Sequence, residues 1–570
     1  MRIKREAFAA AAAAASVLVA AAGCSKQPRH TTAADVDPIE AERAAAPGMF
    51  DAIPLDTPYL FASAEPMAAE VWSLYSEMFA SMEGLFAALE DEADDELLAD
   101  ERFMLELVQA VTENPTREGF AALGFDPDPR FAIYGLGAVP VIRMEIGEAD
   151  AVRALVAEAA ASAGFEPPTR EIAGHEVWAI PGPRTGFVAL LGDELVAVFG
   201  PDAALEAAME TLLGRRELGA TYSEDQLRSL AEAENLSPMG VGYLDTRRLA
   251  SLLLSSGEGL GFELTEHLLG GDRAAPEACV AAVDAALSHV PRISLGYTEL
   301  SRERMGMAGT VHLSEELVPM VAAAQTSVPG LTGSFADAPL FAIGAAVDPQ
   351  AGARVLARVA GELRSVGEAC EQVELQRAAA ELSSNAGASI PAPFSSIQGG
   401  LVVLNSLDLA GMSAEGYLIA GIRRPSTLLR LVRPFVPQLA GLEIATDGVF
   451  RPLPQGLTGL VPFELGLTYA VGDHGVAVAA GETGRAHAGA ALATRPQTSP
   501  LLALAYDYEA FVELLLAAMP AGDASAEDRA AREMLQGFAG MMGLMTMTVA
   551  PVEAGLRLDS VLELELPAGE

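Results

Sequence analysis

The chain has three cysteines, Cys24, Cys279 and Cys370, and their thiols are the groups with the most specific chemistry in the sequence. Neither Cys279 nor Cys370 has another cysteine or a histidine at the spacing of zinc ligands, so we expect no metal site. Cysteines outside the cytosol are usually paired, which favours a Cys279–Cys370 disulfide worth about 2–4 kcal/mol of stability. The alternative is two reduced thiols buried in alanine-rich helices.

The seven histidines are solitary in the sequence and belong to no catalytic motif: His30, His175, His267, His289, His312, His474 and His487. The sequence contains no H-E-x-x-H, G-x-S-x-G or Walker A pattern. With 78 Asp and Glu residues, any two carboxylates could be nominated as an acid–base pair, so such pairs carry no information. We therefore expect no catalytic residues and no cofactor.

Four arginines, Arg423, Arg424, Arg430 and Arg433, form a local cluster of positive charge. Arg430 and Arg433 are three positions apart and can share one face of a helix that begins near Ser426. Such a cluster could bind an anionic group, for example a lipid headgroup or a glycan carboxylate. The alternative is pairing with neighbouring acidic residues, which the abundance of carboxylates favours.

Four methionines, Met541, Met542, Met545 and Met547, lie in one short segment between glycines. Methionine-rich surfaces can accept varied apolar ligands because the side chain is flexible and polarizable. The alternative is a helix and a strand packed in the core.

The first 23 residues predict a signal peptide. The basic residues Arg2, Lys4 and Arg5 precede an apolar run, Ala7–Ala22, that is interrupted only by Ser16. Spanning a bilayer takes about 20 apolar residues, so this run is too short to cross comfortably but suits the core of a signal peptide.

The end of that run, Leu18 to Cys24, resembles the lipobox of bacterial lipoproteins, in which the cysteine becomes the lipidated first residue of the mature chain. The resemblance implies a lipid anchor at Cys24, although Ala21 stands where the pattern prefers leucine. Ala20–Ala22 is also compatible with an ordinary A-x-A cleavage site and plain secretion. Ser25 is not the aspartate that signals retention in the inner membrane, so by analogy the outer membrane is favoured, on either face.

The acidity of the chain excludes some partners. It has 36 Lys and Arg against 78 Asp and Glu, a net charge of -42. Nucleic-acid binding needs clustered basic residues, and adsorption to anionic lipid through bulk charge is equally unfavourable. Hydrophobic residues make up 51% of the sequence and the mean hydropathy is +0.28, which is too apolar for a disordered acidic chain.

Five segments recur in the same order at a nearly constant separation, which predicts an internal duplication. The pairs are marked by Phe61 and Phe341, Val141 and Leu418, Gly174 and Gly448, Gly192 and Gly472, and Ser237 and Ser499.

Each copy is predicted to contain antiparallel hairpins with packed helices, which gives an α+β fold. Gly192-Asp193 and Gly472-Asp473 lie between apolar runs and predict tight hairpin turns. Asp245 and Asp507 are expected to cap helices that follow strands. We expect two homologous lobes, residues 56–330 and 337–567, joined to Cys24 by a flexible tether over residues 24–55.

A signal peptide with a lipobox followed by two copies resembles uncharacterised bacterial lipoprotein families known as domains of unknown function. The resemblance implies an envelope protein held on the membrane through Cys24, and it supplies no catalytic residues. We expect a non-enzymatic protein that binds a protein partner or an apolar ligand between its lobes. The alternative is an envelope hydrolase with a site at the junction of the lobes.

Overall fold

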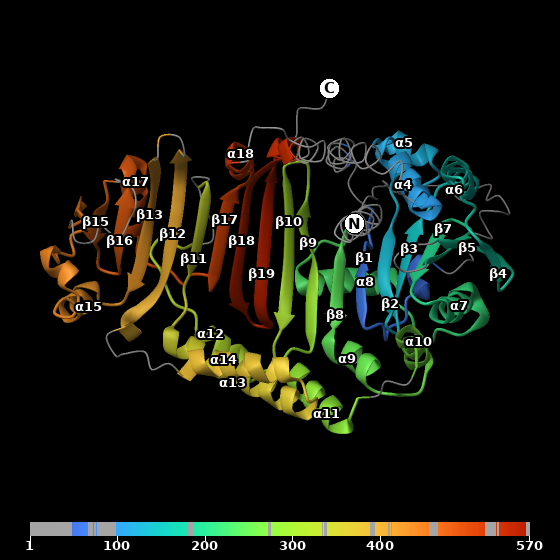
Figure 1. Cartoon of the computed structure of the whole chain (residues 1–570), viewed down its shortest axis with the longest axis horizontal. Coiled ribbons are helices and arrows are strands. Elements are labelled where there is room, and N and C mark those ends of the chain that lie inside the picture. The colour runs from blue at the N-terminus through green and yellow to red at the C-terminus, as the bar shows by residue number, and fades with distance from the viewer. Residues whose placement is uncertain are drawn as a thin grey trace.

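The computed structural model describes residues 48–66, 72, 76, 98–180, 186–271, 275–332, 335, 339–387, 394–408, 411, 413–454, 466–518, 532, 535–537 and 539–565. The predicted signal peptide, Cys24 and most of the predicted tether lie outside these residues. The described strands form one 19-stranded sheet in which every strand pair is antiparallel, with helices packed against it (Figure 1). The predicted α+β fold class is therefore confirmed.

The first half of the described chain ends with strand β10. Its helical segments are η1 (Met49–Ala52), α4 (Ala99–Thr112), α5 (Arg117–Ala122), α6 (Ala149–Ala163), α7 (Asp202–Glu210), η2 (Thr211–Arg215), α8 (Glu224–Glu234), α9 (Thr246–Leu254), α10 (Leu260–Leu269) and α11 (Glu277–Leu287). Its strands are β1 (Tyr59–Ala62), β2 (Phe131–Leu136), β3 (Val139–Glu145), β4 (Thr169–Ile172), β5 (His175–Ile180), β6 (Gly186–Leu191), β7 (Glu194–Phe199), β8 (Val241–Asp245), β9 (Arg292–Leu300) and β10 (Arg304–His312).

The second half follows β10. Its helical segments are α12 (Leu317–Ala322), α13 (Pro349–Ala369), α14 (Val373–Gly387), η3 (Phe394–Ser396), α15 (Pro425–Val432), η4 (Pro437–Gly441), α17 (Gly481–Ala493) and α18 (Tyr508–Ala518). Its strands are β11 (Phe341–Ala345), β12 (Ile397–Asp408), β13 (Ser413–Ile422), β14 (Arg451–Pro452), β15 (Thr468–Val471), β16 (Gly475–Ala480), β17 (Leu502–Asp507), β18 (Met542–Val552) and β19 (Gly555–Leu564).

The predicted turns and caps are confirmed. Gly192 connects β6 to β7 with a φ of 61°, a left-handed conformation that glycine adopts at little cost. Gly472 begins the turn between β15 and β16, where its N–H donates to the Gly475 carbonyl at 2.9 Å. The carboxylates of Asp245 and Asp507 accept backbone N–H groups at the start of α9 and α18.

Both halves arrange their strands in the same order across the sheet. Starting from the middle, the first half runs β10-β9-β8-β1-β2-β3-β7-β6-β5-β4. The second half runs β19-β18-β17-β11-β12-β13-β16-β15-β14. These orders correspond strand for strand, except that β4 has no counterpart among the described strands.

The two halves meet through strand pairing. Nine residues of β10 pair with β19, from Arg304 opposite Glu563 to His312 opposite Gly555. Backbone hydrogen bonds between β10 and β19 therefore join the two halves into one sheet. At this junction the sheet is continuous from one half to the other.

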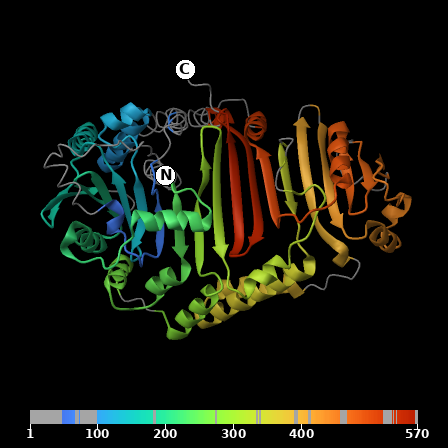
Figure 2. The same ribbon diagram turned by 180° about the vertical axis from the view of Figure 1, so that it is seen from behind.

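Helices cover both faces of the sheet in the first half. We call the face that carries Ile343, Val402 and Leu418 the front face and the opposite one the back face. Figure 2 shows α8 and α17 on the back face, where α7 and α10 also pack over Tyr134 and Val141. On the front face, α4, α5 and α6 cover the first half, and α15 covers β15 and β16.

Two predicted boundaries are wrong. The tether was expected to extend to residue 55, but Phe50 and Ile53 are buried in the first-half core, because η1 packs beneath the sheet. The first lobe was expected to end at residue 330, yet Val328 and Leu331 belong to the core of the second half. The first half therefore begins at or before residue 48, and the second half begins soon after β10.

Candidate functional site

The front face of the middle of the sheet is apolar. Side chains alternate between the two faces of a strand, so residues paired across neighbouring strands form rows on one face. One front row crosses eight strands through Tyr297, Met307, Ser560, Met547, Leu504, Ile343, Val402 and Leu418. The rows on either side, from Leu295 to Ala420 and from Leu300 to Gly416, contain no charged residue.

Many of these side chains are accessible to solvent. Six large hydrophobic residues are 37–45% exposed: Leu295, Met307, Ile343, Val402, Leu418 and Leu558. We call the three rows on β9, β10, β19, β18, β17, β11, β12 and β13 the bare face. No described helix lies over it in Figure 1.

The bare face covers an area somewhat smaller than one side of a standard protein interface. Seven strand spacings of about 4.8 Å and two residue repeats of about 6.8 Å give a patch of about 34 by 14 Å. Exposed apolar patches of several hundred Å² are unusual on a monomeric protein and mark sites of interaction. The border of this patch is extended by α18, in which Phe511 is 40% exposed and its ring centre lies 6.2 Å from that of Tyr506.

The back face differs from strand to strand: β17, β11, β12 and β13 carry the buried core of the second half there, whereas β18 and β19 carry polar residues. Asp559 and Thr548 are paired there on β19 and β18, and Arg557 lies two positions from Asp559 and binds it at 2.9 Å. An antiparallel sheet usually packs its apolar side and exposes its polar side to water. The bare face departs from this rule, because its side chains are apolar and partly exposed although no described helix covers them.

The front rows stay uncharged near neutral pH. Their only ionisable side chains are the phenols of Tyr297 and Tyr506. Burial disfavours the phenolate and raises the pKa of both groups above the ordinary tyrosine value.

A polar cluster lies on the back face at the junction of the halves, where the hydrolase alternative would place a site. Ser294 Oγ donates to Glu234 Oε2 at 2.7 Å and lies 3.1 Å from His312 Nε2. Glu234 Oε1 approaches the same Nε2 atom at 3.2 Å, so the serine and the acid share one ring nitrogen and form no relay. Ser294 is also 1% exposed, which closes its hydroxyl to a substrate.

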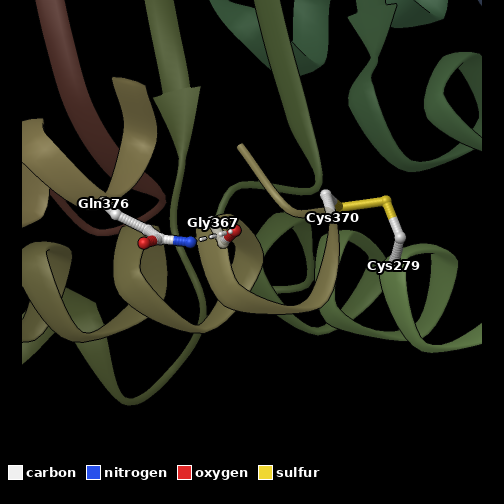
Figure 3. Close-up of a disulfide and its surroundings, with 4 residues drawn as sticks. All are labelled: Cys279, Gly367, Cys370 and Gln376. Carbon is white, nitrogen blue, oxygen red and sulfur yellow. Dashed lines mark hydrogen bonds between the residues drawn. A yellow bond between two sulfur atoms is a disulfide. The ribbon is translucent and has the colours of Figure 1, made fainter. Parts of the chain in front are cut away.

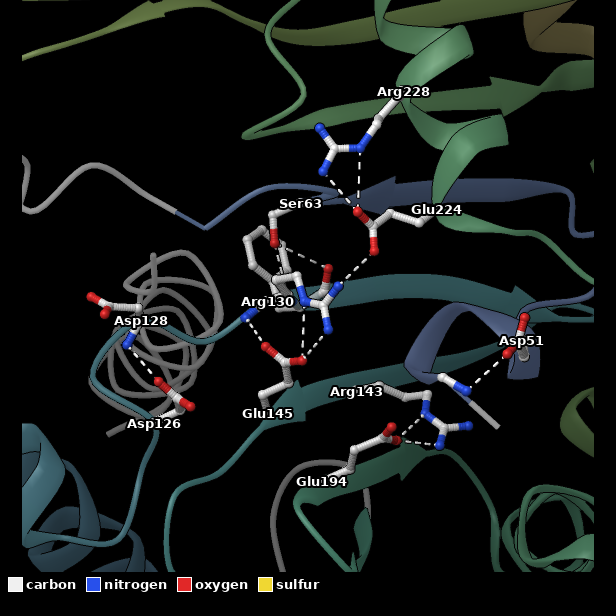
Figure 4. A network of polar contacts seen from close by, with 12 residues as sticks. Asp51, Ser63, Asp126, Asp128, Arg130, Arg143, Glu145, Glu194, Glu224 and Arg228 are labelled. Carbon is white, nitrogen blue, oxygen red and sulfur yellow. Dashed lines mark hydrogen bonds and ion pairs between the residues drawn. The ribbon is translucent and has the colours of Figure 1, made fainter. Parts of the chain in front are cut away.

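The charged groups inside the first half are paired with one another (Figure 4). Arg130 binds Glu145 and, at 2.9 Å, Glu224, which ties β2 to β3 and α8. Arg143 donates to Glu194 inside the core, joining β3 to β7. Each of these carboxylates forms an ion pair with an arginine, so this network holds strands together and none of its carboxylates is a free general base.

The predicted arginine cluster is divided among different roles. Arg423 pairs with Asp348 at 2.9 Å, which is the alternative that the sequence favoured. Arg424 is the N-cap of α15, while Arg430 and Arg433 lie at its C-terminal end, where a cation is stabilised by the helix dipole.

The two cysteines of the body are bonded in the structure. Cys279 on α11 and Cys370 at the end of α13 form a disulfide with a Cα–Cα distance of 4.5 Å (Figure 3). Beside it, the Gln376 side chain donates to the Gly367 carbonyl at 2.9 Å and closes the turn between α13 and α14. The bond therefore joins a helix of the first half to the helical hairpin of the second.

The alternation of apolar and polar residues in the sequence indicates strands of the bare face, but it does not identify the face as a site. Alternation at Leu295 and Tyr297 predicts a half-buried strand, but alternation does not tell which side is covered. Two of the four clustered methionines, Met545 and Met547, lie in the front rows, whereas Met541 is buried.

Within the described residues, no three or more His, Cys, Asp or Glu side chains are grouped so as to hold a metal ion. None of the described helices combines the length and apolarity needed to cross a membrane. No protein family, curated protein or solved structure matches this chain.

Proposed function

We propose that this chain is a lipid-anchored, non-enzymatic protein of the bacterial envelope that binds another protein through its bare face. The observation that carries the proposal is an uncharged front surface on eight neighbouring strands of a chain with a net charge of -42. In so acidic a chain, an uncharged surface of this extent is well explained by an apolar partner.

A protein fits this surface better than a small apolar ligand. Small ligands are held in concave pockets that bury most of their surface, whereas the bare face is the side of an open sheet. Its area of roughly 500 Å² approaches the ~800 Å² that each partner contributes to a standard protein interface.

The charge of the chain indicates the chemistry of the partner. A second copy would bring another charge of -42 to the interface, and the like charges would oppose association. A partner with an apolar centre and a basic border would complement both the bare face and the acidic surface around it.

The shared strand order of the two halves supports a common origin, and the halves differ in the helix pair that leaves the face bare. Between β1 and β2, α4 and α5 cover the front face, whereas between β11 and β12, α13 packs against α14 and α11. Figure 1 shows α13 and α14 below the ends of the strands, away from the front face. We infer that a tandem duplication made both halves and that the second copy moved this helix pair off the sheet.

The partner is identified by photo-crosslinking in intact cells. A photoreactive residue at Val402 is expected to give an adduct with one protein, and a residue at exposed Val449 is not. The adduct's partner is then purified and its affinity for the body is measured. Ile343→Lys with Val402→Lys should abolish this binding, and Val449→Lys should preserve it. An adduct of two identical chains, or adducts only with lipid, would contradict the proposal.

The anchor is tested separately at Cys24. Thioether-linked diacylglycerol and an acylated amino group bury enough methylene groups, at about 0.8 kcal/mol each, to retain even an acidic body on a membrane. Cys24→Ser should prevent labelling by a fatty-acid analogue and release a folded protein to the soluble fraction. If the unaltered protein takes no label and fractionates as soluble material, the anchor is disproved.

A further inference from the structure

We propose that a pocket beside α9 binds a small amphipathic anion, a carboxylate or phosphate group attached to an apolar tail. The pocket has a volume of about 730 Å³, which is within the range of small-molecule sites. It lies between α9, α10, α11 and the start of β9. Its lining combines the cations Arg247, Arg248 and Arg292 with the apolar side chains Leu252 and Phe262.

Arg292 has no counter-charge in hydrogen-bonding contact. Among the described residues, its guanidinium makes no hydrogen bond or ion pair and instead stacks 4.5 Å from the centre of the Tyr243 ring. Tyr243 donates its hydroxyl hydrogen to the Thr57 carbonyl, and burial raises its pKa, so the ring beneath Arg292 is neutral. A partly buried, unpaired cation is unexpected in a chain with twice as many acidic as basic residues.

Unbonded donors are concentrated at this pocket. Six buried side-chain polar atoms have no partner among the described residues, and three of them belong to Arg248 and Arg292. These are Nε of Arg248 and both Nε and Nη2 of Arg292. Buried polar atoms are normally bonded, so this concentration points to a missing acceptor.

The acidic residues around the pocket are already engaged. Asp284 accepts two hydrogen bonds from Arg247, at 2.8 and 2.9 Å, and this contact holds the pKa of Asp284 below its ordinary value. Arg248 pairs with Asp56, and Asp245, opposite Arg292 in the strand pair, accepts the Arg248 N–H. Arg292 is therefore the cation left to receive an external anion.

The pocket is separate from the bare face. Arg292 and His312 lie on the back side of β9 and β10, because they alternate with front residues such as Leu295 and Met307. Binding here would leave the front rows accessible, so the pocket and the proposed partner surface can be tested independently.

Binding is measured by calorimetry on the full chain with octanoate, octyl phosphate and inorganic phosphate. At least one alkyl anion is expected to bind saturably at one site, and inorganic phosphate to bind more weakly because it lacks the apolar tail. Octanoate and octyl phosphate separate a carboxylate preference from a phosphate preference. Failure of both alkyl anions to bind, or equal binding by inorganic phosphate, would overturn the assignment.

Arg292→Gln tests the residue itself. Loss of a charge-assisted bond should weaken binding about tenfold or more. The variant should melt no lower than the parent protein, because it removes an unpaired charge. Arg304→Gln is the matched control, since Arg304 lies on neighbouring β10 and pairs with Glu299 at 3.5 Å at the surface. If Arg292→Gln binds like Arg304→Gln, the assignment is wrong.

Discussion

At the scale of single residues, Arg143 and Glu194 form an ion pair inside the first-half core. Their side chains are 7% and 10% exposed, and Arg143 Nε donates to Glu194 Oε2 at 3.0 Å. Such a pair gains little over apolar residues of the same size, because both charges lose their hydration. Removing one member, however, leaves the other as an unpaired buried charge, which is strongly destabilising.

Glu194→Gln should destabilise the protein by about 3–5 kcal/mol, because it leaves the buried Arg143 without a counter-charge. The matched control is Glu210→Gln, which breaks a surface pair with Arg215 at 2.8 Å and should cost no more than about 1 kcal/mol. Urea unfolding of both variants gives the two free energies. Equal effects would mean that water reaches Arg143.

At the scale of elements, α17 packs closely on the back of β13 through a side made of small residues. Gly484 and Ala488 are buried on that side. A Cβ atom added at Gly484 would lie 2.3 Å from the Gly416 carbonyl oxygen, which no real contact permits. The helix therefore depends on glycine at this one point of approach.

Gly484→Ala should destabilise the protein by about 1–3 kcal/mol, because α17 must move away from β13. Gly489→Ala on the same helix is the control. Its Cβ would meet only the Phe450 ring at an ordinary 3.6 Å, so it should stabilise by about 0.5–1 kcal/mol through helix propensity. Thermal unfolding distinguishes the two signs, and a stabilising Gly484→Ala would contradict the close packing.

The paired segments of the sequence lie on strands that occupy corresponding positions in the two halves, but at one strand the paired residues lie on opposite faces. Val141 was matched to Leu418, but Val141 is fully buried while Leu418 is 45% exposed. The buried residue beside it on β13 is Ile419. Shifting the alignment by one residue moves every side chain to the other face of the strand. Because Leu418 and Ile419 are both apolar, the sequence does not show which of them faces the core.

At the scale of the whole molecule, the charge of -42 opposes the compact state through self-repulsion. Raising NaCl from about 10 to about 150 mM shortens the screening length from about 30 to about 8 Å and should raise the melting temperature at pH 7. Near pH 4.4, the isoelectric point, the same change should have little effect. KCl at equal ionic strength is the control, and an unchanged melting temperature at pH 7 would show that repulsion is unimportant.

The sequence by itself determined the α+β class, the hairpin turns at Gly192 and Gly472, and the helix caps at Asp245 and Asp507. These features depend on residues that are neighbours in the chain, where backbone conformation and short hydrogen bonds decide the outcome. The tether boundary failed because burial of Phe50 depends on distant strands.

Only the tertiary structure decided that β10 pairs with β19, that the halves share one sheet, and that the front of the middle of the sheet is bare of described helices. Alternation along a strand defines two faces, but the helices that cover a face come from elsewhere in the chain. Likewise, the sequence did not indicate Arg292 as a site residue, because its having no partner among the described residues depends on where the surrounding acidic side chains fold.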